Sequence, residues 1–190
     1  MADIKTQKLL YHLTPFENLP SVLTGGLKPR SKLAAFKDVA DQAIIQKRQG
    51  LSLEDFVPFH WFALNPFDGS VQTAHRGDAF ALITVRRELA SRNGWKVIAR
   101  HPLANGDIEL LDYAPGFAAI DWETMNRREY RDPNCKNVCM AECLAPGPVP
   151  TNQFFCIYVR DNALERQARI WANGENALIN IAVNENMFLK

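Results

Sequence analysis

The sequence predicts an α+β fold, and three observations support this class. Two strongly apolar runs, residues 80–85 (FALITV) and 154–159 (FFCIYV), are typical of central strands, and a helical pattern follows each of them. Strand and helix patterns do not alternate strictly, and the strands cluster in the second half of the chain. With 190 residues, 47% of them hydrophobic, the chain is long enough for one core. We therefore expect a single domain over residues 1–190.

The individual elements follow from local apolar patterns and from stop signals. Strands are expected at residues 9–13, 56–64, 80–85, 96–99, 109–113, 154–159 and 178–183. Helices are expected at residues 18–23, 35–48, 67–76, 86–92 and 162–171, with a further short helical piece from residue 120. Gly26, Gly94 and Gly174 follow three of these helices as stops. Pro58 restricts its strand to a sheet edge or an irregular strand.

Composition and charge bound the function. The formal net charge is +1, so a nucleic-acid or membrane site would have to be a local patch. No signal peptide and no apolar run long enough to span a membrane is visible, which indicates a cytoplasmic protein with reduced thiols. The four cysteines lie at positions 135, 139, 143 and 156. Their spacing lacks the second Cys or His pair of a zinc site, so buried thiols are the preferred interpretation.

The stretch 125–150 (MNRREYRDPNCKNVCMAECLAPGPVP) carries the most informative carboxylate, Glu142. A lone ionisable group in an apolar run is costly to bury unless it is paired or functional. As a strand, the run would place Glu142 with Met140 and Leu144 on one face and the cysteines on the other; as a helix, it would stack the cysteines. A solvent-facing glutamate on an edge strand is the alternative to a functional one.

Other candidate site residues lie near the ends of elements. His12 and Thr14 share one face where the first strand ends, and His12 is either a hydrogen-bonded core residue or a ligand contact. Arg48 comes at a helix end, where it either complements the helix dipole or binds an anion. Arg30 is either exposed or an anion contact.

Several common chemistries are absent from the sequence. It contains no G-x-G-x-x-G, no P-loop, no H-E-x-x-H and no G-x-S-x-G motif. Asp107, Glu109 and Asp112 are close in sequence, but a strand would direct Asp112 away from the other two. A two-metal nuclease site is therefore weakly supported.

Several segments together resemble the DarT family of DNA-modifying ADP-ribosyltransferases. YHLTPFENLPSVLTGGL resembles the family's Tyr-His-x-Thr opening and the helix after it, and DVADQAIIQKR with FVPF resembles its basic-ended helix and Val-Pro-Phe strand. MNRREYRDPNCKNVCMAECL resembles its Met-Asn-x-Arg segment leading to Ala-Glu, and VPTNQFFCIYV fits the next strand. The matches extend from residue 11 to about residue 183. One segment departs from the family: ALNPFDGSVQTAHR stands where many members have Pro-Arg-Ser-Pro-Met, as in members that modify guanine rather than thymine.

The resemblance implies an ADP-ribosyltransferase fold, with two small packed antiparallel-rich sheets and flanking helices around an NAD cleft. It implies transfer of ADP-ribose from NAD, as substrate and without a metal, to guanine or thymine in single-stranded DNA, as a toxin with a macrodomain antitoxin. Glu142 matches the catalytic glutamate, and Arg48, or Lys47 beside it, the functional arginine. The NAD contacts implied by the resemblance are His12, Leu13, Thr14, Asn18 and Arg30.

The residues ahead of Glu142 suit contact with DNA. The arginines could meet phosphates, and an aromatic ring could stack on a base. The expected contacts are Arg127, Arg128, Arg131 and Tyr130, with Trp122 as a second stacking candidate. Three alternatives stay open: the same fold acting on protein or RNA, a metal-dependent nuclease, and an inactive binding module.

Overall fold

The computed structural model describes residues 3–33, 36–39, 42–104, 108–175 and 177–190, without the side chains of Ala43, Ile44 and Lys47. Its strands are β1 Leu9–Pro15, β2 Phe56–His60, β3 Phe80–Arg86, β4 Lys96–Ile98, β5 Leu111–Asp112, β6 Glu142–Pro146, β7 Cys156–Val159 and β8 Ile181–Val183. Its helices are α1 Leu19–Gly25, α2 Gln42–Gly50, α3 Pro66–Ala74, α4 Arg87–Arg92, α5 Tyr113–Ala119, α6 Trp122–Arg127, α7 Pro133–Cys139 and α8 Asn162–Gly174. The α+β class is confirmed.

The strands form one hydrogen-bonded sheet in the order β5-β4-β6-β2-β1-β3-β7-β8. All neighbours are antiparallel except β7 and β8, which are parallel and are connected through α8. The expectation of two separate sheets is therefore corrected to one sheet. Its two halves nevertheless meet at a narrow junction, because β1 and β2 pair only through Tyr11 and His60.

Pro58 accounts for this narrow junction. Proline has no main-chain N–H, so β2 cannot continue a ladder with β1 at that position. The Pro58 carbonyl instead accepts a hydrogen bond from the His12 side chain of β1. The expected edge position of Pro58 is wrong, since β2 lies inside the sheet between β6 and β1. The proline is tolerated there because the two halves part beside it.

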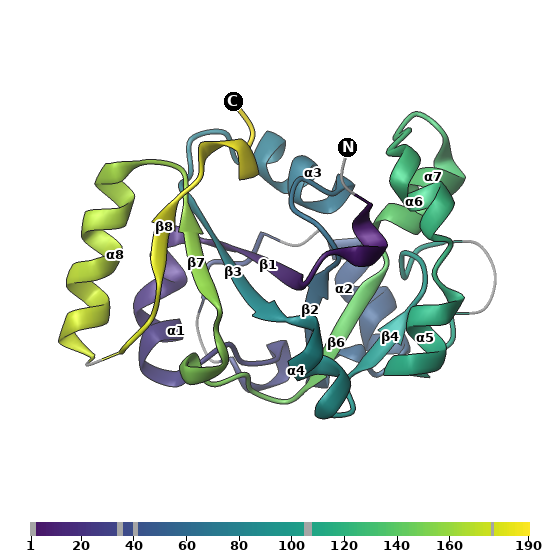
Figure 1. Cartoon of the computed structure of the whole chain (residues 1–190), viewed down its shortest axis with the longest axis horizontal. Helices are drawn as coiled ribbons and strands as arrows, with labels where there is room; N and C mark the ends of the chain where they lie inside the picture. The colour runs from purple at the N-terminus through teal and green to yellow at the C-terminus, as the bar shows by residue number, and fades with distance from the viewer. Residues whose placement is uncertain (1–2, 34–35, 40–41, 105–107, 176) are drawn as a thin grey trace.

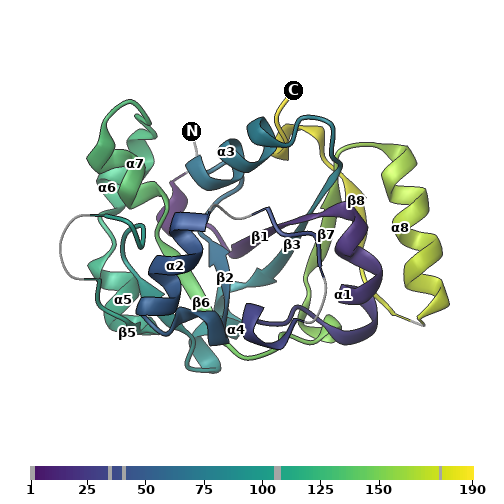
Figure 2. The same cartoon turned by 180° about the vertical axis from the view of Figure 1, so that it is seen from behind.

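The helices cover the sheet in three places (Figures 1 and 2). α1 and α8 lie together at one end, while α5, α6 and α7 lie at the other. α2 and the chain that leads to it lie over β2 and β6 on the face turned to the viewer in Figure 2. Within the described residues, no helix is long and apolar enough to cross a membrane.

Strand alternation decides which side chains enter the main core. β6 directs Cys143 into the largest apolar cluster and Leu144 into a smaller cluster with Leu53 and Ile98. Glu142 shares the face of Leu144, since side chains two apart on a strand point the same way. The same alternation turns Cys143 away from the face that carries the carboxylate.

Helix boundaries differ from the expected ones in two regions. The helix expected from Ala35 begins only at Gln42, and residues 36–39 have no regular secondary structure. Ala35 itself lies outside the described residues. The expected strand at residues 109–113 is reduced to β5, because Tyr113 begins α5. Gly116 lets α5 approach β4 closely, since an added Cβ would lie 2.5 Å from Val97 Cβ.

The helix α7 was considered only as the alternative to a strand across the cysteine run. The segment around Cys135 and Cys139 is helical, and the strand begins only at Glu142. The sequence signal for α7 is Asp132-Pro133. The Asp132 carboxylate accepts a hydrogen bond from Asn134 N at 2.9 Å, and proline occupies the first helical turn. Both geometries considered for the cysteine run thus occur, one after the other.

Candidate active site

A cavity of about 500 Å³ lies where the two halves of the sheet part. Its walls come from β1 and the turn after it, from the segment between residues 26 and 39, from α2, and from β2 and β6. Apolar side chains such as Val22, Phe36 and Phe56 make up much of the lining. Residues from both sheet halves therefore meet around one space that can hold a ligand.

Glu142 lies at the start of β6 and is 5% exposed. β6 has β4 on one side and β2 on the other, so the alternative of a solvent-facing edge glutamate is wrong. The carboxylate lines the cavity and accepts a hydrogen bond from the guanidinium of Arg48. A buried carboxylate needs such a cationic partner to remain ionised.

Arg48 reaches Glu142 from α2, a separation of 94 residues in the sequence. Its second terminal nitrogen donates to the Leu53 carbonyl at 3.2 Å, which fixes the direction of the guanidinium. In the ion pair, the Glu142 side chain is buried and the Arg48 side chain is 12% exposed. The alternative residue, Lys47, has a side chain outside the described part of the structure.

His12 combines the two interpretations that the sequence left open. Its Nδ1 lies 2.7 Å from the Pro58 carbonyl, which can only accept, so this nitrogen carries the proton. Burial lowers the pKa of His12, and the nearby Arg48 lowers it further, while the Pro58 carbonyl raises it. The ring is therefore neutral at pH 7, with Nε2 as an acceptor. His12 both bonds across the sheet junction and lines the cavity.

His60 is a cavity residue that the sequence analysis missed. It pairs with Glu142 in the β2–β6 ladder, is 5% exposed, and lies against the Phe67 ring at a centroid distance of 5.3 Å. Burial lowers its pKa to about 3, and Arg48 contributes to the lowering. The signal was the alternation of FVPFH, which places Pro58 and His60 on one face.

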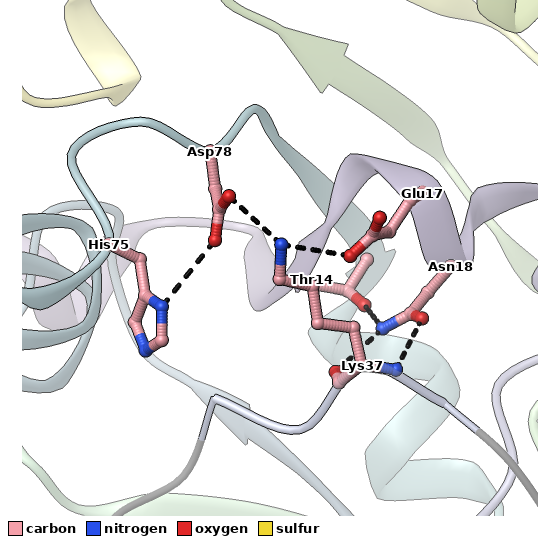
Figure 3. A network of polar contacts seen from close by, with 6 residues as sticks. All are labelled: Thr14, Glu17, Asn18, Lys37, His75 and Asp78. Carbon is pink, nitrogen blue, oxygen red and sulfur yellow. Dashed lines mark hydrogen bonds and ion pairs between the residues drawn. The ribbon is translucent and has the colours of Figure 1, made fainter.

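Thr14 and Asn18 belong to a polar network at the rim (Figure 3). Asn18 Nδ2 lies 3.5 Å from Thr14 Oγ1 and donates to the Lys37 carbonyl at 3.0 Å. Arg30 lines the cavity and forms an ion pair with Asp38, and its guanidinium lies 5.3 Å from the Phe36 ring centroid. With Leu13, the five residues expected to contact NAD all line this cavity.

The residues expected to contact DNA lie in and after α6, outside the cavity lining. Arg127 is 3.7 Å from the Asp132 carboxylate, and Arg128 lies over the Phe62 ring at 4.8 Å. Arg131 is exposed, and Tyr130 is 37% exposed with its hydroxyl 3.4 Å from the Leu64 carbonyl. The structure therefore keeps these four side chains at one protruding end.

The stacking role considered for Trp122 is wrong. Trp122 is 7% exposed, donates to the Phe117 carbonyl at 2.9 Å and packs edge-on against Trp61. No base could reach its face without unfolding α6.

The cysteines are buried free thiols. Cys135 and Cys139 hydrogen-bond to main-chain carbonyls of α6, while Cys143 lies in the main core. Across the described residues, no group of three or more His, Cys, Asp and Glu side chains could hold a metal ion. Asp107, one of the carboxylates considered for a nuclease, lies outside the described residues.

Comparison with known proteins adds an independent finding. Residues 11–189 match the family described as "ssDNA thymidine ADP-ribosyltransferase, DarT". Among proteins with curated functions, none matches. Two solved structures of Thermus sp. 2.9 DarT are similar at 14% identity. The complex with ADP-ribosylated ssDNA has a TM-score of 0.84 over 96% of both chains. The complex with NAD+ has a TM-score of 0.80 over 97% of this chain and 98% of that one.

A third similar structure comes from Thermosipho africanus. DarTG in complex with ADP-ribose matches with a TM-score of 0.76 at 21% identity, over 96% of this chain and 51% of that chain. At these identities, the structural matches establish the fold.

Proposed function

This chain belongs to the DarT family of NAD-dependent single-stranded-DNA ADP-ribosyltransferases, and we propose that the cavity with Glu142 and Arg48 is its NAD site. The observation that carries this proposal is the position of Glu142. It is a buried carboxylate that lines a cavity and has a guanidinium as its partner. A structural ion pair alone would not need a ligand-sized space beside it.

The residues around the cavity fit NAD. Its volume of about 500 Å³ lies within the range of small-molecule sites, roughly 300–1,000 Å³. Arg30, which pairs with Asp38 at the cavity wall, offers a guanidinium that would exchange this partner for a pyrophosphate, while Arg48 stays paired with Glu142. Phe36 and Phe56 offer apolar walls for aromatic rings. The Thr14 hydroxyl and the neutral His12 ring offer neutral polar contacts for ribose and the nicotinamide amide.

Glu142 would act on the bond between nicotinamide and ribose. When this bond breaks, nicotinamide leaves with the electron pair and positive charge develops on the ribose carbon. The carboxylate stabilises that charge, as carboxylates do in glycoside hydrolysis. A ring nitrogen of the DNA base then forms the new bond and releases its proton, which Glu142 is proposed to accept. Arg48 holds the carboxylate in place through their ion pair.

The proposal also specifies which DNA base accepts the ADP-ribose. The family description specifies thymidine, whereas segment 63–76 departs from the common family pattern. This segment forms α3, and its Phe67 lines the cavity beside His60. The departure therefore lies at the site and supports guanine as the acceptor. Oligonucleotides that contain either guanine or thymine as the single reactive base will decide between the two.

The proposal includes partners and context. Arg127, Arg128, Arg131 and Tyr130 are proposed to contact the DNA strand, and residues 1–190 to act as one domain in the cytoplasm. A macrodomain antitoxin that removes the ADP-ribose is the proposed partner. Its test is direct: a macrodomain hydrolase added to the modified oligonucleotide should restore the original mass.

The test of the function uses NAD, single-stranded oligonucleotides and mass spectrometry. The wild-type protein should add the mass of one ADP-ribose to DNA, and Glu142→Gln should abolish this while still binding NAD. Glu88→Gln is the matched control, because Glu88 is an exposed residue of α4 that pairs with Arg92. A folded wild-type protein that modifies no oligonucleotide, or that labels only RNA or protein, would overturn the proposal.

A further inference from the structure

We infer that Lys37 is a positioning residue that latches a cavity wall in place, and this inference rests on the proposed NAD site. The wall is the strap, defined as residues 36–39, and Phe36, Lys37, Asp38 and Val39 all line the cavity. The strap has no regular secondary structure, and in the sequence it lies between a 3-10 turn at Arg30–Lys32 and α2. It therefore depends on contacts with the rest of the protein for its position.

The first contact is a fork made by the Lys37 ammonium. Its Nζ lies 2.9 Å from Glu17 Oε1 and 2.9 Å from Asp78 Oδ1 (Figure 3). Asp78 also lies 3.4 Å from His75 Nδ1. Lys37 thus joins the strap to two segments that are distant in sequence, the turn after β1 and the loop between α3 and β3.

The anchors of the fork are rigidly placed. Glu17 lies just after Phe16, which follows β1, and Asp78 lies just before Ala79, which precedes β3; these strands are antiparallel neighbours with Pro15 opposite Phe80. Phe16 N donates to the Ala79 carbonyl at 2.8 Å, so the two anchor segments are hydrogen-bonded to each other. The two carboxylates therefore present a fixed pair of acceptors at one end of the sheet.

The second contact holds the main chain of Lys37. Its N–H donates to Asn18 Oδ1 at 2.9 Å, and its carbonyl accepts from Asn18 Nδ2 at 3.0 Å. Asn18 Nδ2 also lies 3.5 Å from the Thr14 hydroxyl. The Asn18 amide thus connects the strap to a proposed NAD contact, which gives Asn18 a positioning role beside its proposed contact with NAD.

The charges and the solvent exposure of the Lys37 ion pairs suit a contact that can open and re-form. The carboxylates of Asp78 and Glu17 raise the pKa of Lys37, and Lys37 lowers the pKa of Asp78, so Lys37 and Asp78 are both charged at pH 7. The side chains of Lys37 and Glu17 are 34% and 59% exposed. Exposed ion pairs are individually weak and exchange readily with water. The strap can therefore be released for NAD entry and then held again.

The test compares steady-state kinetics of strap variants in the oligonucleotide reaction. Lys37→Met should raise KM for NAD about tenfold with kcat within about twofold, the pattern expected when binding of the substrate and of the transition state is weakened equally. Asp78→Asn should act in the same direction, and the double variant should be no worse than the more affected single variant, since both remove one interaction. Lys37→Arg should restore most of the affinity.

Lys32→Met is the matched control, because Lys32 is an exposed lysine that also lines the cavity. It measures the effect of losing one positive charge near an anionic substrate. An equal rise of KM in Lys32→Met and Lys37→Met, or additive effects of Lys37→Met and Asp78→Asn, would overturn the latch.

A second measurement separates the latch from the proposed function. Hydrogen exchange in the protein without NAD should be faster for the main-chain amides of the strap in Lys37→Met, and unchanged in Lys32→Met. Faster exchange together with no activity on any nucleic acid would contradict the proposed function and keep the latch. Unchanged exchange with normal wild-type activity would do the reverse.

Discussion

Glu142 and Asp68 are both buried carboxylates, and the protein treats them in opposite ways. Glu142 accepts a hydrogen bond from Arg48 and lines the cavity. Asp68, in the first turn of α3, is 1% exposed, and neither of its oxygens has a hydrogen-bond partner among the described residues. Burial raises the pKa of Asp68 to about 7, and the nearby polar groups of Asn65 and Leu64 offset it only in part.

The difference shows which of the two buried carboxylates the fold provides with a cationic partner. A guanidinium is supplied to the carboxylate beside the ligand-sized space, whereas the carboxylate inside α3 is left to hold its proton. A charge buried without a partner is costly, so the Arg48 pairing indicates that an ionised Glu142 is needed. Three substitutions test this comparison. They remove the cation beside Glu142, replace the Asp68 carboxylate, and remove an exposed cation outside both sites.

The largest effect is expected from Arg48→Met, which would leave Glu142 as isolated as Asp68. Removing one partner of a buried ion pair typically costs about 3–5 kcal/mol of unfolding free energy. Activity should be lost as well, because the carboxylate would no longer be oriented. Urea unfolding at pH 8 and the oligonucleotide assay measure the two effects.

Arg92→Met is the control for this variant. Arg92 pairs with Glu88 on the exposed surface of α4, where such pairs contribute about 0–1 kcal/mol. Equal destabilisation by Arg48→Met and Arg92→Met would show that the Glu142–Arg48 pair contributes no more to the unfolding free energy than an exposed ion pair does.

An intermediate effect is expected from Asp68→Asn, and its sign depends on pH. The folded protein keeps a proton on Asp68 up to about pH 7, whereas the unfolded chain releases it near the ordinary value of 3.8. The wild type therefore loses stability as pH rises between about 4 and 7. Asparagine cannot ionise, so the variant should gain on the wild type across this window, by up to a few kcal/mol at pH 8.

The measurement is the difference in unfolding free energy between the two proteins at pH 5 and pH 8. Burial lowers the pKa values of His12, His60 and His101, so these residues favour folding as pH rises. They are the same in both proteins and cancel in the difference. A difference that does not change with pH would show that Asp68 is already ionised in the folded protein.

The smallest effect on stability is expected from Arg131→Ala. Arg131 is exposed and has no ion-pair or hydrogen-bond partner among the described residues. Its removal should leave the unfolding free energy nearly unchanged and weaken DNA binding by one phosphate contact. The slope of log K against log salt should fall by about 1. Arg166→Ala, an exposed position on α8 at the other end of the molecule, should not change the slope.

Much of the fold could be predicted from local patterns. β3 and β7 follow from buried apolar runs, and α8 begins after Asp161, whose carboxylate accepts from Ala163 N at 2.9 Å. The helices α5 and α7 were missed because Pro115-Gly116 and the cysteine run obscured their apolar spacing. Joining the strands into one sheet was not predictable, because the β1–β2 junction depends on one residue pair and on the His12–Pro58 contact.

The candidate site shows the same division. Glu142, Arg48 and the β1 residues His12, Leu13 and Thr14 were singled out from sequence, and all of them line one cavity. His60 and Lys37 were not. The alternation of FVPFH places His60 on the face of Pro58 but does not show that this face lines a cavity, and nothing local distinguishes a lysine in a polar segment. Their importance arises from contacts across the chain, such as Lys37 with Glu17 and Asp78.

The class of fold, the family resemblance and the kinds of residue needed for catalysis can be read from the sequence, because they depend on local patterns and on ordered motifs. Which buried charged groups have a partner depends on the tertiary structure. The pairing of Glu142 with Arg48, the isolation of Asp68 and the fork of Lys37 all depend on burial and on distances between segments far apart in the chain. Desolvation and charge pairing are properties of the packed molecule, and no local pattern encodes them.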